Sequence, residues 1–134
     1  MFPKESRVLI ADDSLVVRRS IRNMFNDLNF SLVEEAKDGQ LALEQIISKA
    51  GTGEAFSLII SDINMPNMDG LHLIKELRSN PGLVNLPFIF VTARGQEKDI
   101  EEGLALGANS YITKPFTKED LLNSLLEVWE KIKS

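Results

Sequence analysis

The sequence predicts an α/β protein built on one five-stranded parallel sheet with helices on both faces. Two observations support this fold class. Short apolar runs rich in β-branched residues alternate five times with longer segments whose apolar residues recur at helical spacing. Turn and capping residues separate these segments at short intervals, as is typical of consecutive βα units. Parallel strands covered by helices on both faces are the expected result.

The first unit begins with a buried strand at 7–11. The acidic and hydroxyl residues at 12–14 can cap a helix, which we expect to extend to about residue 28. Its apolar residues follow the helical spacing i, i+4, i+7, i+8 and i+11. They are Val17, Ile21, Met24, Phe25 and Leu28. Arg18 and Arg19 lie beside this stripe, and we expect them to form a solvated face.

The second unit contains a weaker strand at 32–36. Its low hydrophobicity, with Glu34 and Glu35 at its centre, suits a position near an edge of the sheet. Asp38 and Gly39 begin the following helix. The apolar residues predicted to mark this helix are Leu41, Leu43, Ile46 and Ile47.

The third strand, at 58–60, continues from Phe56 and leads directly into Asp62. Pro66 and Gly70 then break the chain, so that Asp62 lies at the carboxyl end of a buried strand. Leu71, Leu73, Ile74 and Leu77 mark the next helix. This helix is expected to stop near the turn residues at 80–82.

The fourth and fifth units complete the sheet. The run 88–91 is the most apolar in the chain, and we expect it to be a central strand that ends at Thr92. A helix at about 96–106 follows, with Gly107 as its C-cap, and Gly103 inside it should weaken it. A short edge strand is predicted at 110–113.

Thr117 caps the last helix, with Glu119 and Asp120 in its first turn, where negative charge suits the helix dipole. The residues expected on its buried face are Leu121, Leu122, Leu125, Leu126, Trp129 and Ile132.

Composition narrows the possible functions. The formal net charge of −5 argues against nucleic acid as the main ligand, because a phosphate backbone requires a basic surface. The absence of cysteine excludes disulfides and thiolate metal sites. No apolar run approaches the roughly 20 residues that span a bilayer, and the N-terminus does not have the pattern of a signal peptide. We therefore expect one cytoplasmic domain over 1–134, with its core at about 7–133 and no output domain.

Polar residues follow four of the five strands: Asp12 and Asp13, Asp62, Thr92 and Lys114. If the strands are parallel, these residues meet at one edge of the sheet, where open α/β sheets bind their ligands. Carboxylates that lie together require a raised pKa or a cation between them. An oxygen-only donor set, with the sole histidine, His72, on a helix elsewhere, favours Mg²⁺ over zinc. Such a site suits a phosphoryl group, with one carboxylate as the nucleophile.

The motifs at these strand ends resemble the receiver domain of two-component response regulators. The matching elements are Asp12-Asp13, the segment 62–70 with the sequence DINMPNMDG, Thr92 and Lys114-Pro115, in the family's order. The segment 62–70 is especially similar to that of the stand-alone chemotaxis receivers of the CheY type. The resemblance covers about residues 7–133. It implies a flavodoxin-like (βα)5 fold with strand order 2-1-3-4-5.

The resemblance also implies roles for individual residues. Asp62 would accept a phosphoryl group from a histidine kinase, and Thr92 and Lys114 would contact that group. Asp13, Asp62 and the backbone carbonyl of Asn64 would bind Mg²⁺, and Asp12 would act partly through water.

Three further expectations follow from the same resemblance. Tyr111 would be the switch aromatic that turns inward as Thr92 moves. The Lys114-Pro115 peptide would be cis. Arg94 and Asn64 would flank the phosphoryl group and affect its lifetime, in a direction that the sequence does not give for Arg94.

The function implied is a phosphorylation switch that signals by changing the affinity of one face for a partner. This face comprises the fourth helix, the fifth strand and the fifth helix. The expected partners are a CheA-like histidine kinase, a target such as the flagellar motor switch and a phosphatase, with neither nucleic acid nor a membrane involved. We expect the protein not to be an enzyme, although it assists its own phosphorylation and dephosphorylation.

Three alternatives remain. The first is a stand-alone receiver in a phosphorelay outside chemotaxis. The second is a metal-dependent phosphatase with an Asp nucleophile, although such enzymes usually carry a D-x-D pattern after strand one, where this chain has Asp12-Asp13-Ser14. The third is a flavodoxin-like electron carrier, in which the two carboxylates would repel a flavin phosphate.

Overall fold

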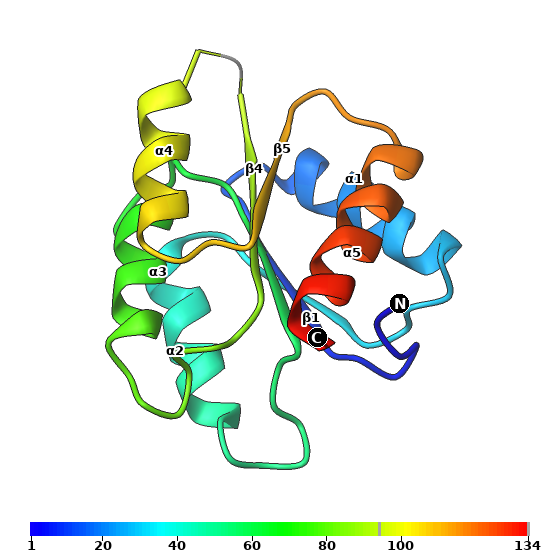
Figure 1. Cartoon of the computed structure of the whole chain (residues 1–134), viewed down its shortest axis with the longest axis horizontal. Coiled ribbons are helices and arrows are strands. Elements are labelled where there is room, and N and C mark those ends of the chain that lie inside the picture. Colours follow the sequence, from blue (N-terminus) through cyan, green and yellow to red (C-terminus); the bar gives the residue numbers. More distant parts are fainter. Residues whose placement is uncertain (94, 134) are drawn as a thin grey trace.

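Five parallel strands form a single sheet in the order β2-β1-β3-β4-β5 (Figure 1). The structure is a computed structural model that describes residues 1–93 and 95–133. The strands are β1 Val8–Ala11, β2 Val33–Ala36, β3 Leu58–Ser61, β4 Phe88–Thr92 and β5 Ser110–Thr113. The predicted fold class and strand order are therefore confirmed, and β2 lies at a sheet edge as its polar sequence indicated.

The most apolar strand, β4, is an interior strand of the sheet, as expected, and β3 is the middle one. β4 lies between β3 and the edge strand β5. All five of its residues are buried. A strand that is apolar along its whole length indicates burial on both of its faces, which the helices provide here. It does not indicate how far the strand lies from the edge of the sheet.

Five helices connect the strands. They are α1 Leu15–Asp27, α2 Gly39–Lys49, α3 Gly70–Arg78, α4 Glu97–Ala105 and α5 Lys118–Lys133. The side chains of Ser14, Asp38 and Asp69 each accept a backbone N–H in the first turn of the helix that follows. Thr117 and Asp120 cap α5 reciprocally, each side chain accepting the backbone N–H of the other residue.

The helices divide into two layers, with α1 and α5 on one face of the sheet and α2, α3 and α4 on the other (Figure 1). Alternate residues of each strand point to opposite layers: Val8 and Ile10 pack toward α1 and α5, and Leu9 and Ala11 pack toward α2 and α3. Two hydrophobic cores result. They fix the strand ends in a rigid frame, which leaves the carboxyl edge of the sheet to carry polar groups.

The buried face of α5 is narrower than its leucine content predicts. Leu121, Leu125 and Val128 are fully buried, whereas Leu126 and Ile132 are exposed. The buried set follows i, i+4 and i+7, a single stripe facing the sheet, and Leu126, one position off this stripe, turns toward solvent. Ile132 continues the stripe but lies in the last turn of α5, where it is exposed. In α2, Ile47 is exposed for the same reason as Leu126.

The two ends of the described chain pack together. Phe2 is buried, and its ring lies 5.1 Å from that of Trp129, centroid to centroid. Trp129 is partly buried against the core. None of the helices in residues 1–93 and 95–133 has both the length and the apolar character needed to cross a membrane.

Gly103 has a packing role that its helix propensity does not reveal. A Cβ atom at this position would lie 2.5 Å from a ring carbon of Phe90, which is fully buried in β4. The missing side chain therefore lets α4 approach the sheet closely. After Gly103, α4 ends with the N–H of Ala108 bonded to the Gly103 carbonyl and that of Gly107 bonded to Leu104, with Gly107 at φ +106°.

Candidate functional site

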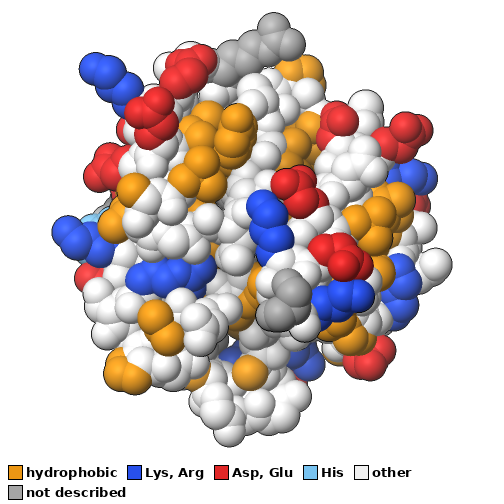
Figure 2. Space-filling view, in the orientation of Figure 1, with side chains coloured by type: hydrophobic (Ala, Val, Ile, Leu, Met, Phe, Trp, Pro, Cys, Tyr) orange, Lys and Arg blue, Asp and Glu red, His pale blue; other side chains and the backbone are white. Residues whose placement is uncertain are grey.

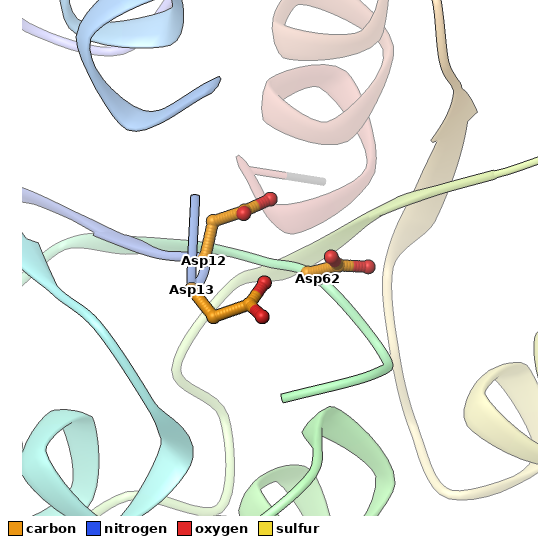
Figure 3. Close-up of side chains that lie close together, drawn as sticks. All are labelled: Asp12, Asp13 and Asp62. Atoms are coloured by element: carbon orange, nitrogen blue, oxygen red, sulfur yellow. The ribbon is translucent and has the colours of Figure 1, made fainter. Parts of the chain in front are cut away.

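Three carboxylates converge at the carboxyl edge of the sheet (Figure 3). Ala11 of β1 pairs with Ser61 of β3, so the residues that follow these two lie side by side. The backbone N–H of Asp62 donates to the Ala11 carbonyl at 2.9 Å and fixes this register. One carboxylate oxygen from each of Asp12, Asp13 and Asp62 lies within 4.8 Å of the other two. The predicted convergence is confirmed.

Lys114 reaches this cluster from the residue that follows β5. Its Nζ donates to Asp12 Oδ2 at 2.8 Å and to Asp62 Oδ2 at 3.2 Å. The second oxygen of each carboxylate accepts a backbone N–H, from Ser14 for Asp12 and from Ile63 for Asp62. Each of the two buried carboxylates is thus held by one fixed backbone donor and one ammonium group.

Burial and charge shift the protonation of these groups. Only 2% of the Asp12 side chain, 12% of Asp62 and 24% of Lys114 are exposed. Burial raises the pKa of Asp62, and the neighbouring Asp12 charge adds to this, although Lys114 opposes both. Burial lowers the pKa of Lys114, but the hydrogen bonds and charges of Asp12 and Asp62 outweigh it and leave this pKa raised. The ammonium therefore stays protonated between its two partners.

The donor set fits a hard divalent cation. Three carboxylates and one ammonium leave a formal charge of −2 at the site. Asp13 is the exposed member of the three, so the cluster opens to solvent on its side. The ligands are oxygens only, as Mg²⁺ prefers. His72 is exposed and pairs with Glu76 on α3, so it is not part of this cluster.

Asn64 lies in the loop between β3 and α3 and is exposed, and its carbonyl remains a predicted ligand.

Thr92 ends β4 and is fully buried. Its hydroxyl donates to the Oε1 atom of Gln96, the residue before α4, and makes only a long contact of 3.5 Å to the Ala93 carbonyl.

Tyr111 of β5 is exposed, and its switch role remains a prediction. The Lys114-Pro115 peptide is cis, as expected. Arg94, for which an effect on phosphate lifetime was predicted, lies outside the described residues.

The loop that carries Asp62 is fastened to α2 by a contact that the sequence did not reveal. Asp38 is buried, and while its Oδ1 caps α2, its Oδ2 accepts the side-chain amide of Asn67 at 2.9 Å. The N–H of Gly39 donates to the Met68 carbonyl at 3.0 Å. In the sequence, Asp38 and Gly39 indicate only the start of a helix, because their partners, Asn67 and Met68, lie far along the chain.

Arg18 corrects the expectation of a solvated face. Only 13% of its side chain is exposed, and it donates to the Asp12 carbonyl at 2.7 Å and to Glu35 at 3.0 Å. Arg19 and Arg22 also bond to Glu35, so one carboxylate on β2 gathers three guanidinium groups. Arg18 thereby braces the backbone beside the carboxylate cluster, while Arg19 remains exposed as predicted.

The comparisons with known proteins agree with this geometry. The family model for the response regulator receiver domain matches residues 8–126. The chemotaxis protein CheY-3 of Vibrio cholerae is 36% identical over 129 residues, which cover 96% of this chain and 95% of that protein.

Solved structures give the same result. The chemotaxis protein CheY4 of V. cholerae is 35% identical, with a TM-score of 0.80, over 92% of this chain and 98% of that one. CheY of Borrelia burgdorferi, in a complex of CheX, CheY, BeF₃ and Mg²⁺, is 26% identical, with a TM-score of 0.83, over 92% of this chain and 89% of that one. The chain belongs to the response regulator receiver domain family.

Proposed function

We propose that this protein is a phosphorylation-activated switch of a two-component system in which Asp62 accepts a phosphoryl group from a histidine kinase. The observation that carries the proposal is the position of Asp62, whose carboxylate lies among Asp12, Asp13 and Lys114 at the edge of the sheet where ligands bind. Asp62 is held rigidly by a backbone donor, and the exposed Asp13 leaves one side of the site open.

The reaction needs little from the protein beyond positioning and charge. A carboxylate oxygen of Asp62 attacks phosphorus, the bond from phosphorus to the kinase histidine breaks, and the imidazole leaves with its electron pair. Lys114 supplies positive charge to the oxygens of the transferring group, and the Thr92 hydroxyl can donate a hydrogen bond to it. We propose no turnover of separate substrates, so the protein is an acceptor rather than an enzyme.

Mg²⁺ fits the remaining negative charge. Asp13, Asp62 and the Asn64 carbonyl would hold it, with Asp12 acting through water. When bound, the ion offsets the charge of the phosphoryl oxygens beside the carboxylates. The family membership and the oxygen-only donor set support this choice of metal.

The output surface that we propose lies on α4, β5 and α5. Leu104 and Tyr111 are large hydrophobic residues exposed on α4 and β5. Figure 2 shows hydrophobic side chains on this side of the molecule beside acidic ones over α4. Such a mixed surface suits a protein partner. Phosphorylation would move Thr92 and Tyr111 and so change the affinity of this surface for its partner.

Similarity to the chemotaxis relatives supports a specific setting. We propose a CheA-like kinase as donor, the flagellar motor switch as target and a phosphatase that ends the signal. The relatives from V. cholerae are named as chemotaxis proteins, and the chain covers nearly their whole length. A receiver in a different phosphorelay would use the same site with other partners.

Incubation with acetyl phosphate and MgCl₂, followed by mass spectrometry, tests the proposal. We expect the intact protein to gain the mass of one phosphoryl group and Asp62→Asn to gain none. Asp69→Asn is the matched control, because Asp69 lies in the same loop, is exposed and caps α3 outside the cluster. Equal labelling of Asp62→Asn and wild type would contradict the assignment.

A further inference from the structure

The Thr92 hydroxyl already has a partner in this structure. It is fully buried, and Gln96 Oε1 is its close acceptor. The side chain of Gln96 makes no capping hydrogen bond to α4, although Gln96 is the N-cap residue. The acceptor is therefore directed at the site instead of at the helix that it begins.

A hydroxyl has one proton to donate. If Thr92 donates that proton to a phosphoryl oxygen on Asp62, it cannot donate it to Gln96 at the same time. Among the described residues, the other acceptor that Thr92 contacts is the Ala93 carbonyl, which lies at 3.5 Å, too far to replace Gln96. As acceptors of the one Thr92 proton, Gln96 Oε1 and a phosphoryl oxygen are thus mutually exclusive.

We propose that Gln96 is a positioning residue that holds Thr92 away from the phosphoryl site in the unphosphorylated protein and so opposes the activated state. This inference rests on the proposed function, since it requires a phosphoryl group at Asp62. Phosphorylation would exchange the hydrogen bond between Thr92 and Gln96 for one between Thr92 and the phosphoryl group. Removing the Gln96 acceptor removes the competing bond and favours the activated state.

The same bond connects the site to the output surface. Gln96 directly precedes Glu97, the first residue of α4, and its backbone carbonyl accepts the N–H of Ile100 at 3.0 Å. Release of its side chain by Thr92 would therefore act on the residue that begins α4, part of the surface proposed to bind a partner. Gln96 therefore links the Thr92 hydroxyl at the site to the N-terminal end of α4.

The test uses beryllofluoride with MgCl₂ as the phosphoryl mimic and measures its affinity by calorimetry. We expect Gln96→Ala to bind the mimic roughly 2- to 12-fold more tightly than wild type, the range for the loss of one neutral hydrogen bond from the free state. Gln96→Glu, which keeps an acceptor at this position, should not gain affinity. Lys98→Ala is the control, because Lys98 is exposed in the same turn of α4.

A double-mutant cycle separates this role from a merely structural one. Thr92→Val keeps the shape of the side chain but removes the hydroxyl, so Gln96→Ala should have no effect on affinity in that background. As a second readout, the NMR signal of the Gln96 side-chain amide should move when wild type binds the mimic and stay in place in Thr92→Val.

The outcomes are distinguishable. Tighter binding by Gln96→Ala that disappears in the Thr92→Val background supports the proposal. Unchanged or weaker binding by Gln96→Ala overturns it, as does a gain that persists without the hydroxyl. If wild type fails to bind the mimic, or binds it equally well as Asp62→Asn, the proposed function itself fails.

Discussion

Replacing Asp13 by Asn should stabilise the metal-free protein and greatly weaken its response to Mg²⁺. Asp13 has one oxygen within 4.8 Å of oxygens of Asp12 and Asp62. Two charges at that distance repel by about 0.9 kcal/mol in water and about 3.5 kcal/mol at an effective dielectric constant of 20. Because Asp13 is exposed, the lower value applies more closely, and two such pairs give about 2 kcal/mol.

Attraction to Lys114 offsets part of this repulsion, so we expect a net gain of about 1 kcal/mol. For a domain of this size, that raises the melting temperature by about 3–5 °C. Wild type should gain about 1.4 kcal/mol from Mg²⁺ at ten times its dissociation constant. Asp13→Asn should gain much less, since it lacks one of the three carboxylates that attract the ion.

The assay is thermal unfolding with and without MgCl₂, followed by circular dichroism. Asp27→Asn provides the matched control, since Asp27 is exposed on α1, lies outside the cluster and contacts Lys118 at 3.7 Å. It should shift little and should keep the response to Mg²⁺. A mutant at position 13 that is less stable than wild type without metal, or that responds to Mg²⁺ as wild type does, would refute the argument from crowded carboxylates.

Three further predictions test the frame around the site. Gly103→Ala should destabilise by up to about 2 kcal/mol in urea unfolding, because overpacking against Phe90 costs about 1–3 kcal/mol and the helix gains only about 1; a more stable variant would contradict this. Asp38→Ala should cost about 2–3 kcal/mol in the same assay, since it loses a helix cap and the bond to the neighbouring loop. Burial raises the pKa of Glu35, but its arginine partners outweigh this and hold it below its usual 4.5. The stabilising contribution of Glu35 should therefore be full near neutral pH and fade as pH falls through the lowered pKa. Glu35→Gln should accordingly be less stable than wild type at pH 7, and the difference should shrink in acid; a gap independent of pH would exclude this linkage.

The strand ends could be predicted from sequence because each rests on a local signal. An apolar run that ends in Asp62, or in Thr92, marks both a buried strand and the residue that follows it. Parallel pairing then brings such residues to one edge whatever the loop details. Parallel topology thus predicts the shared edge of the carboxylates and Lys114, whereas the strand order that makes β1 and β3 neighbours came from the family resemblance.

The contacts that could not be predicted join residues with no local signal for each other. Helix propensity treats Gly103 as a weakness, whereas its role comes from Phe90 on a different element. The bond between Asp38 and Asn67 spans two loops, and either residue alone indicates only a cap or a turn. Helical spacing similarly predicts the direction of a side chain but not the width of the buried stripe. Leu126 was therefore predicted to be buried, whereas it is exposed.

The arginines around Glu35 show the same limit for charged residues. Arg18 and Arg19 are adjacent and alike in sequence, yet 13% of the Arg18 side chain is exposed, beside the site, against 63% of Arg19. The difference depends on where β2 places Glu35, which only the assembled sheet determines.

A crystal structure of the protein with Mg²⁺ and beryllofluoride would test the central claim most directly. The account predicts beryllium on a carboxylate oxygen of Asp62, the metal bound between Asp13 and Asp62, and fluorine atoms within hydrogen-bond distance of Thr92 Oγ1 and Lys114 Nζ. Beryllofluoride bound elsewhere, or a metal that leaves Asp13 and Asp62 without contact to it, would contradict the account.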